Sequence, residues 1–296
     1  MGLELTRSGF VAIAGRPNVG KSTLANAIVG SKVAIISDKP QTTRRAIRGI
    51  ATGEGWQLVL VDLPGVQRPR DALTMRMQRR VEHELEDADA CLLVVNAEQG
   101  IGPGDRFISG SLEGATVPVV IAVNKADRAD RARIAEVLTD AEALGVADEI
   151  FPVSARTGEG VSAIVEGLVS LLPEGPFYFP PEQHSDLTEQ VLLAELVREQ
   201  VLARTRQEVP HAVEVELQDI EHHEDLVRIE AVILVETESQ KGILVGAGGR
   251  MVKTIGTAAR RVLEGELGRR VHLALSVRVR RHWRTDEHLL DRLGIE

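Results

Sequence analysis

The sequence predicts an α/β protein in which a doubly wound, mainly parallel sheet is followed by a smaller α+β domain. Over the first 172 residues, apolar runs alternate with helical patterns, as strands and helices do in such a sheet. A proline-containing stretch follows, and then a new order of helix, two strands, two helices and a strand begins. The 296 residues suffice for two hydrophobic cores. We expect one domain over 1–172, a linker over 173–187 and a second domain over 188–296.

The first domain is expected to consist of short buried strands joined mostly by helices. The strand-like apolar runs lie at 10–14, 46–52, 56–62, 91–95, 119–123 and 150–155. The helical patterns lie near 22–29, 73–87, 104–114, 131–144 and 160–172. Two of the strands flank Gly53-Glu54-Gly55, a sequence typical of a hairpin turn.

The second domain begins after a stretch that holds four of the chain's twelve prolines, between Pro173 and Pro181. Its expected elements are a helix over 188–205, strands near 212–219 and 226–236, a short helix before a glycine-rich loop, a longer helix from about Arg250 and a strand over 271–281. That last strand alternates, with Arg278 and Arg280 on one face and apolar residues on the other. The cationic face is either solvated or meets phosphates, and both readings remain open.

Charge is distributed unevenly along the chain. The formal net charge is −9, yet the segment 241–284 holds eleven Lys and Arg residues against two Glu residues. A solvated helix face usually mixes both signs, so this excess indicates a polyanion site near the C-terminus. Stacking platforms for bases need aromatic residues, and Trp283 is the only one after Phe179.

The composition is that of a cytoplasmic globular protein. No apolar run approaches the roughly 20 residues of a membrane-spanning helix, and the N-terminus has no signal-peptide pattern. The single cysteine, Cys91, lies in an apolar strand and indicates a reducing compartment. We expect a monomer.

A phosphate-binding loop is predicted between the first strand and the first helix. The sequence GRPNVGKS fits G-x-x-x-x-G-K-[ST], and its place after a strand and before a helix makes the match specific. Lys21 is expected to reach the β- and γ-phosphates, and the Ser22 hydroxyl to bind Mg²⁺. The residues expected to contact nucleotide here are Gly15, Arg16, Pro17, Asn18, Val19, Gly20, Lys21, Ser22 and Thr23.

One segment indicates guanine rather than adenine. Asn124-Lys125-Ala126-Asp127 follows an apolar strand, and the Asp127 carboxylate can accept hydrogen bonds from guanine N1–H and its 2-amino group. Adenine lacks both donors in that arrangement, so the site discriminates between the bases. Ser154 and Ala155 end the next strand and are expected to close over the base. GTP or GDP is therefore the expected ligand, with Asn124 and Lys125 beside Asp127.

A second magnesium-binding segment is Asp62-Leu63-Pro64-Gly65, at the end of a strand. Asp62 is expected to hold Mg²⁺ through water, and the Gly65 N–H to meet the γ-phosphate, with Leu63 and Pro64 between them. In the polar loop upstream, a threonine can complete the metal shell, and Thr43 is preferred over Thr42. The expected magnesium set is Ser22, Thr43 and Asp62.

Three interpretations compete for the second glycine loop, VGAGGRMVKTIG. A dinucleotide loop fails because the third glycine position is Met251, and a second phosphate loop fails because G-K-[ST] is missing. A G-x-x-G clamp between two helices fits, since bare glycines let an RNA backbone approach closely. The expected RNA-binding residues are Lys241, Gly246, Ala247, Gly248, Gly249, Arg250 and Lys253. Aliphatic candidates for the adjoining groove are Ile243, Val245, Val252 and Ile255, although at least two of these are expected to pack in the core.

These motifs together carry a family resemblance. GRPNVGKS, QTTRR, DLPG and NKAD, in this order, resemble the translation-factor-related GTPases, and the second domain resembles a type II KH domain. Over nearly the whole chain, the combination resembles the Era family of bacterial ribosome-assembly GTPases. The resemblance implies Mg²⁺-dependent GTP hydrolysis and binding to the 3′ region of 16S ribosomal RNA during 30S subunit maturation. It also implies peripheral association with the inner face of the cell membrane.

The sequence departs from the family pattern at three places. Val66 stands where Ras-like GTPases place the glutamine that orients the attacking water, so no catalytic residue is assigned and slow intrinsic hydrolysis is the hypothesis. Gln67 is adjacent, but sequence does not fix its direction. Leu63 replaces a common threonine, and the GAGG clamp lacks a charged residue. The alternatives are a regulatory GTPase whose second domain binds protein, and a P-loop ATPase, which conflicts with NKAD.

Overall fold

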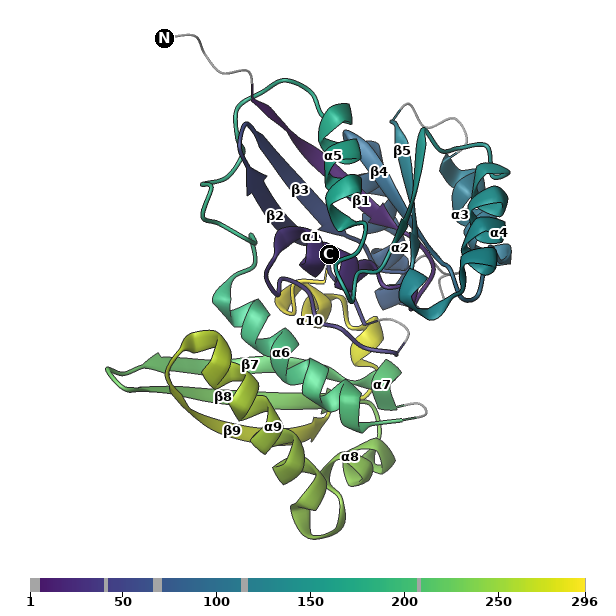
Figure 1. Cartoon of the computed structure of the whole chain (residues 1–296). Coiled ribbons are helices and arrows are strands. Elements are labelled where there is room, and N and C mark those ends of the chain that lie inside the picture. The colour runs from purple at the N-terminus through teal and green to yellow at the C-terminus, as the bar shows by residue number, and fades with distance from the viewer. Residues whose placement is uncertain (1–5, 40–41, 66–70, 113–116, 207–208, 296) are drawn as a thin grey trace. The chain divides into compact units, whose positions relative to one another are not determined.

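A computed structural model describes most of the chain, and it divides into two compact units (Figure 1). The described residues are 6–39, 42–65, 71–112, 117–206 and 209–295. The first unit runs essentially to Asp186, and the second starts at Leu187. Short described stretches at 37–39 and 71–73 group with the second unit.

The first unit is built on a six-stranded sheet with the order β2-β3-β1-β4-β5-β6. Its strands are β1 (Arg7–Ala14), β2 (Ile47–Gly53), β3 (Trp56–Asp62), β4 (Ala90–Asn96), β5 (Val119–Asn124) and β6 (Glu149–Val153). Only β2 is antiparallel, and it pairs with β3 through the hairpin that the sequence predicted. The remaining neighbours are parallel, so their carboxyl ends meet at one edge.

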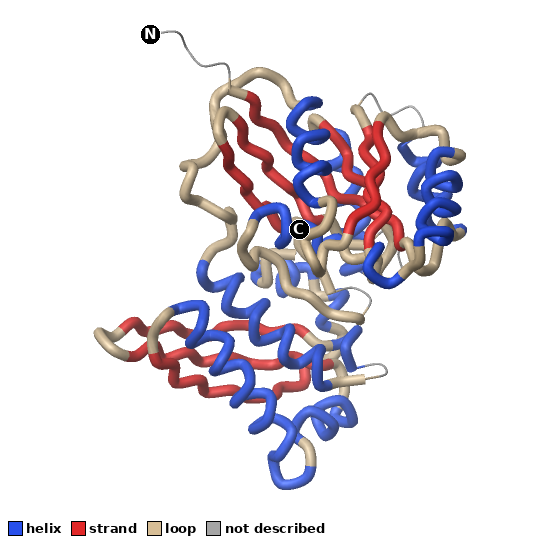
Figure 2. Tube along the Cα trace, viewed as in Figure 1, coloured by secondary structure: helices blue, strands red, loops and turns tan. Residues whose placement is uncertain are grey.

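Helices cover both faces of this sheet, which confirms the predicted doubly wound fold (Figure 2). The helices are α1 (Lys21–Val29), α2 (Ala72–Glu86), α3 (Pro103–Leu112), α4 (Arg131–Glu142) and α5 (Val161–Leu171). Strand β1 shows the two faces by alternation. Val11 and Ile13 pack with residues of α1 and α5, whereas Ala14 packs with residues of α3 and α4.

Residues 174–186, which we call the strap, are hydrogen-bonded to the first unit. Gln57 of β3 is fully buried, and its side-chain oxygen accepts hydrogen bonds from the main-chain nitrogens of Tyr178 and Phe179 at 2.9 and 3.0 Å. Its side-chain nitrogen donates to the Phe179 carbonyl at 2.9 Å. Farther along, Ser185 forms an antiparallel bridge with β2. The stretch that was expected as a linker is therefore held against the sheet.

The second unit is a three-stranded sheet with the order β7-β8-β9. Its elements are α6 (Glu189–Arg204), α7 (Val209–Ala212), β7 (Glu214–His222), β8 (Leu226–Val235), α8 (Glu238–Val245), α9 (Arg250–Leu267), β9 (Arg270–Val279) and α10 (Glu287–Arg292). Strands β7 and β8 are antiparallel, and β8 and β9 are parallel. Helices α6 and α9 lie side by side on one face of this sheet (Figure 1).

The main elements of the second unit appear in the predicted order, and two short helices are additions. Helix α7 precedes β7, and α10 follows β9. Trp283 explains how the C-terminal segment is anchored, because it is fully buried and its indole N–H donates to the Ala212 carbonyl at 2.9 Å. The lone late aromatic residue is therefore part of the core.

Candidate functional site

The phosphate loop joins β1 to α1 at the carboxyl edge of the sheet, and two of its positions require glycine. Gly15 has φ 146° and Gly20 has φ 102°, both in the region that favours glycine. A Cβ on Gly15 would lie 2.5 Å from the Val94 carbonyl oxygen, and one on Gly20 would collide with the Asn124 side-chain nitrogen. No side chain caps α1, so the N–H groups at its start are available to an anion.

Lys21 is held inward by the loop itself. Its ammonium group donates to the carbonyl oxygens of Gly15 at 3.0 Å and Arg16 at 3.2 Å. Burial lowers the pKa of Lys21 to about 8, and the charge of Asp62 opposes that shift. A buried ammonium with few competing partners is well placed to pair with a phosphate.

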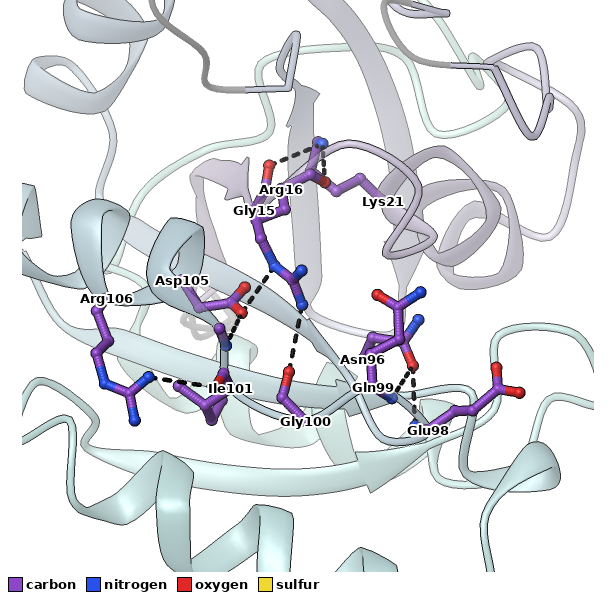
Figure 3. Close-up of polar contacts among 11 residues, drawn as sticks. Gly15, Arg16, Lys21, Asn96, Glu98, Gln99, Gly100, Ile101, Asp105 and Arg106 are labelled. Atoms are coloured by element: carbon purple, nitrogen blue, oxygen red, sulfur yellow. Dashed lines mark hydrogen bonds and ion pairs between the residues drawn. The ribbon is translucent and has the colours of Figure 1, made fainter.

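The Arg16 side chain points away from the loop, toward the segment between β4 and α3 (Figure 3). Its Nε lies 2.7 Å from the Asp105 carboxylate, and its Nη2 donates to the Gly100 carbonyl at 3.2 Å. Arg16 stays a predicted nucleotide contact through its main chain, and its guanidinium has these partners. Sequence reasoning did not select Asp105, because no motif joins it to the phosphate loop.

The three residues of the expected magnesium set come together. The Ser22 hydroxyl donates to Asp62 Oδ2 at 2.6 Å, and the Thr43 hydroxyl donates to the same oxygen at 3.2 Å. The two hydroxyl oxygens are 3.1 Å apart. Asp62 Oδ1 is buried without a hydrogen-bond partner among the described residues. Burial raises the pKa of Asp62, while Lys21 and the two hydroxyl groups oppose that shift. Three oxygen donors and a buried, unpaired carboxylate oxygen fit Mg²⁺.

The NKAD segment contacts the phosphate loop and the loop after β6. Asn124 donates to the Val19 carbonyl at 2.9 Å and accepts from the Ala155 N–H at 3.0 Å. Lys125 has φ 66° and donates to the Asn18 carbonyl at 2.6 Å. Both residues therefore act as supports that join the loops around the site.

Asp127 is oriented by Ser154, whose hydroxyl donates to it at 2.7 Å. This hydrogen bond lowers the pKa of Asp127, and the nearby charge of Arg156 acts in the same direction. Arg156 lies 2.9 Å from the other carboxylate oxygen and its side chain is 77% exposed. Sequence reasoning missed Arg156, although its position directly after Ser154-Ala155 was a usable signal.

The remaining predicted nucleotide residues surround the same loop. A Cβ on Gly65 would lie 3.0 Å from the Pro17 ring, so this glycine approaches the phosphate loop closely. Leu63 and Pro64 are buried, and Thr23 lies in the first turn of α1. Val66 and Gln67, which bear on hydrolysis, lie outside the described residues.

The second glycine loop connects α8 to α9 and is open. Gly246, Gly248 and Gly249 have φ of 68°, 60° and 76°. A Cβ on Gly248 or Gly249 would meet nothing within 4 Å, so a ligand backbone has room to approach. Arg250 donates back to the Ala247 carbonyl at 3.2 Å, and its side chain is exposed. Lys253 is exposed and Lys241 is partly buried.

A groove of about 330 Å³ lies between α9 and the edge strand β9. Its lining mixes cations with apolar groups and includes Val252, Lys253, Gly256, Arg260, Leu273 and Leu275. Of the four aliphatic candidates, Val252 lines this groove, whereas Ile255 is fully buried in the core. Ile243 is 45% exposed outside the groove. Sequence reasoning missed Arg260, because its direction depends on how α9 packs on the sheet.

The first unit is a doubly wound sheet that carries a phosphate loop and an aspartate placed to bind guanine. The second unit carries a G-x-x-G loop. Together they define a GTP-binding protein with a KH module. Family models agree: residues 10–125 match the "50S ribosome-binding GTPase" family and residues 208–284 match the KH domain. The chain is 44% identical to GTPase Era of Mycolicibacterium paratuberculosis, over 97% of this chain and 98% of that protein. It is 42% identical to GTPase Era of Alkaliphilus metalliredigens, over 98% and 99%. The chain belongs to the GTPase Era family.

Two solved structures share this architecture. Aquifex aeolicus Era, as a variant bound to GDP·AlF4⁻, superposes with a TM-score of 0.94 at 34% identity, covering 98% of this chain and 99% of that one. Era in complex with MgGDPNP and nucleotides 1506–1542 of 16S ribosomal RNA gives the same values. Among the described residues, no helix has the length and apolar character needed to cross a membrane.

Proposed function

We propose that this chain binds and hydrolyses GTP with Mg²⁺ and binds the 3′ region of 16S ribosomal RNA during maturation of the 30S subunit. The observation that carries the nucleotide half is the convergence of Ser22, Thr43 and Asp62, from three separate segments, within 3.2 Å of one another. The RNA half is supported by the open glycine loop and by the related Era complex with a 16S fragment.

The phosphate loop supplies the contacts to the phosphates. Its N–H groups and the start of α1 surround the β-phosphate, and Lys21 adds a positive charge. Ser22, Thr43 and Asp62 would hold Mg²⁺, which neutralises charge on the β- and γ-phosphate oxygens when it is bound. The Gly65 N–H faces the γ-phosphate, so this segment and the Thr43 segment respond to the loss of that group after hydrolysis.

Asp127 selects the base. Its carboxylate accepts hydrogen bonds from guanine N1–H and the 2-amino group, and the Ser154 hydroxyl fixes its orientation. Ser154 and Ala155 form the wall over the base. Asn124 joins this wall to the phosphate loop, so the base site and the phosphate site are built as one piece.

Slow intrinsic hydrolysis is part of the proposal, because Val66 has no group that can orient water. Single-turnover hydrolysis by the isolated protein tests it, with Gln67→Ala as the variant. The expected result is a slow rate that the substitution leaves unchanged. Fast hydrolysis that Gln67→Ala abolishes would contradict it and would assign the role to Gln67.

The second unit binds RNA through two adjoining surfaces. The Gly246–Gly249 loop lies against the phosphate–sugar backbone, and Lys241, Arg250 and Lys253 contribute positive charge. The groove between α9 and β9 takes unstacked bases on its aliphatic floor, with Arg260 at its wall. The exposed guanidinium of Arg260 pairs with a phosphate.

Crosslinking of the intact chain to a 16S 3′-terminal RNA, with a GTP analogue or with GDP, tests the RNA half. We expect crosslinks in the second unit, and we expect them to disappear in Gly248→Asp. Binding should weaken steeply as salt rises, because phosphate contacts release counterions. RNA affinity that is equally weak in both proteins and insensitive to salt would favour a protein-binding role for the second unit.

The proposal includes four further points. The nucleotide domain covers 1–172, the linker 173–187 and the RNA-binding domain 188–296, and the protein is a cytoplasmic monomer that associates peripherally with the membrane. Sedimentation equilibrium tests the monomer. Co-sedimentation with vesicles of anionic phospholipid tests the membrane association, and absence of the chain from the pellet at low salt would contradict it.

A further inference from the structure

The side chain of Arg16 joins the phosphate loop to a buried carboxylate outside every nucleotide-binding motif of the chain. Asp105, at the start of α3, has no exposed side-chain surface and lies 2.7 Å from Arg16 Nε. Its Oδ2 also accepts the Gly102 N–H at 2.8 Å. The Arg16 side chain is 24% exposed, but loss of the arginine would leave the enclosed Asp105 charge uncompensated in the interior.

The start of α3 is shaped around this arginine. A Cβ on Gly104 would lie 2.7 Å from Arg16 Cδ, and one on Gly102 would lie 3.5 Å from its Nη1. The Gly100 carbonyl accepts from Arg16 Nη2 at 3.2 Å. Gly104 therefore leaves room for the side chain that reaches Asp105, and the Gly100 carbonyl binds its far end.

The main chain of Arg16 links this anchor to the phosphate site. The carbonyl oxygens of Gly15 and Arg16 both accept hydrogen bonds from the Lys21 ammonium group. The opposite half of the loop is supported elsewhere, by Asn124 at Val19 and by Lys125 at Asn18. The anchor on Arg16 is thus the side-chain support for the half of the loop that holds Lys21.

We propose that Asp105 is a positioning residue for the phosphate site: it holds Arg16 so that the first half of the loop presents Lys21 to the nucleotide. The inference rests on the proposed nucleotide function and adds a residue that contacts no part of the ligand. It predicts that loss of the carboxylate charge weakens binding of the β-phosphate specifically, while contacts to the base persist.

The first test is Asp105→Asn in the full chain, which keeps the shape and an acceptor for the Gly102 N–H. Binding of fluorescent GDP is measured directly, and GMP, which lacks the β-phosphate, is measured by competition. We expect the Kd for GDP to rise about tenfold, within the usual range of coupling between sites, and the GMP value to change little. The matched control is Arg106→Ala, since this neighbouring exposed arginine donates only to the Ile101 carbonyl in the described contacts.

A second variant separates positioning from folding. Gly104→Ala keeps both charges and should favour helix α3 by about 1 kcal/mol at an interior position, less near its start, yet its Cβ would displace the Arg16 stem. We expect weaker GDP binding without loss of thermal stability. If Asp105→Asn does not fold, this variant still decides the question.

A double-mutant cycle completes the test. In an Arg16→Ala background, Asp105→Asn should produce no further change in the Kd for GDP, because the carboxylate acts only through the arginine. Wild-type GDP affinity in both Asp105→Asn and Gly104→Ala, or additive effects in the cycle, would overturn the inference. A wild-type chain that binds no GDP would instead overturn the proposed function.

Discussion

The two glycine-rich loops of this chain differ in the space around their glycines. In the phosphate loop, a Cβ on Gly15 or Gly20 would strike neighbouring atoms, and the nearby Lys21 is buried. In the second loop, a Cβ on Gly248 or Gly249 would meet nothing within 4 Å, and the flanking cations are largely exposed. An enclosed loop suits one small ligand held from all sides, whereas an open loop suits a polymer that passes across it.

The largest loss of GDP affinity is expected when a side chain is added inside the phosphate loop. Gly20→Ala would place a methyl group against Asn124 at a φ that only glycine adopts easily. Backbone strain of about 1–3 kcal/mol and a disturbed buried hydrogen bond of about 1–3 kcal/mol together predict a loss of GDP affinity on the order of a thousandfold. Equilibrium binding of fluorescent GDP measures it. RNA affinity of the same variant serves as the control and should stay at the wild-type value.

A smaller loss of GDP affinity is expected from a substitution in the base site. Asp127→Asn replaces an acceptor by a group that also donates, so GDP affinity should fall about 100-fold, by the loss of charge-assisted hydrogen bonds. Xanthine nucleotide, which presents an acceptor in place of the 2-amino group, should bind better than GDP. Ser154→Ala is the companion variant, because it keeps the Asp127 carboxylate and removes the hydroxyl that orients it, together with the hydrogen bond that this hydroxyl accepts from the Thr157 N–H. An unchanged preference for GDP over xanthosine diphosphate in Asp127→Asn would argue against the assigned base contact.

A side chain on Gly248 would meet no neighbour but would add backbone strain at a positive φ, and a negative side chain should also repel RNA. Gly248→Asp should weaken RNA binding about 30-fold through repulsion of phosphate, an effect of several kcal/mol at close range, and should leave GDP binding unchanged. Gly265→Asp is a matched control, since it adds the same charge to the same unit where a Cβ also has open space. Filter binding to a 16S 3′-terminal RNA is the measurement. Equal losses in both variants would point to general charge rather than to the loop.

The smallest effect concerns the groove beside the open loop. Arg260→Ala should reduce RNA affinity about threefold, and it should lower the slope of log affinity against log salt by roughly one, as expected for one lost phosphate contact. Affinities at several salt concentrations determine that slope. If the slope of log affinity against log salt equals that of the wild type, Arg260 does not contact a phosphate of the RNA.

The motifs made much of the candidate site predictable, because each carries its own local geometry. A strand, a glycine loop and a helix place Ser22, and parallel strand ends bring Asp62 to the same edge. The structure brings Thr43 to both of them, as expected, although a bound metal stays a prediction. Asp105 was not predictable, because its partner is determined by how two separate loops pack together. Gln57 looked like an ordinary polar strand residue, and only the packed strap shows why it is buried.

The strap also determines how much free chain connects the two units. A flexible linker over 173–187 would reach roughly 50 Å when fully extended, at about 3.3 Å per residue. Because Gln57, β1 and β2 hold residues of the strap, the chain is attached to the first unit as far as Ser185, and α6 already begins at Glu189. The free tether is therefore only a few residues long, with a reach of roughly 10 Å. The connection between the two units is therefore too short to act as a long flexible linker.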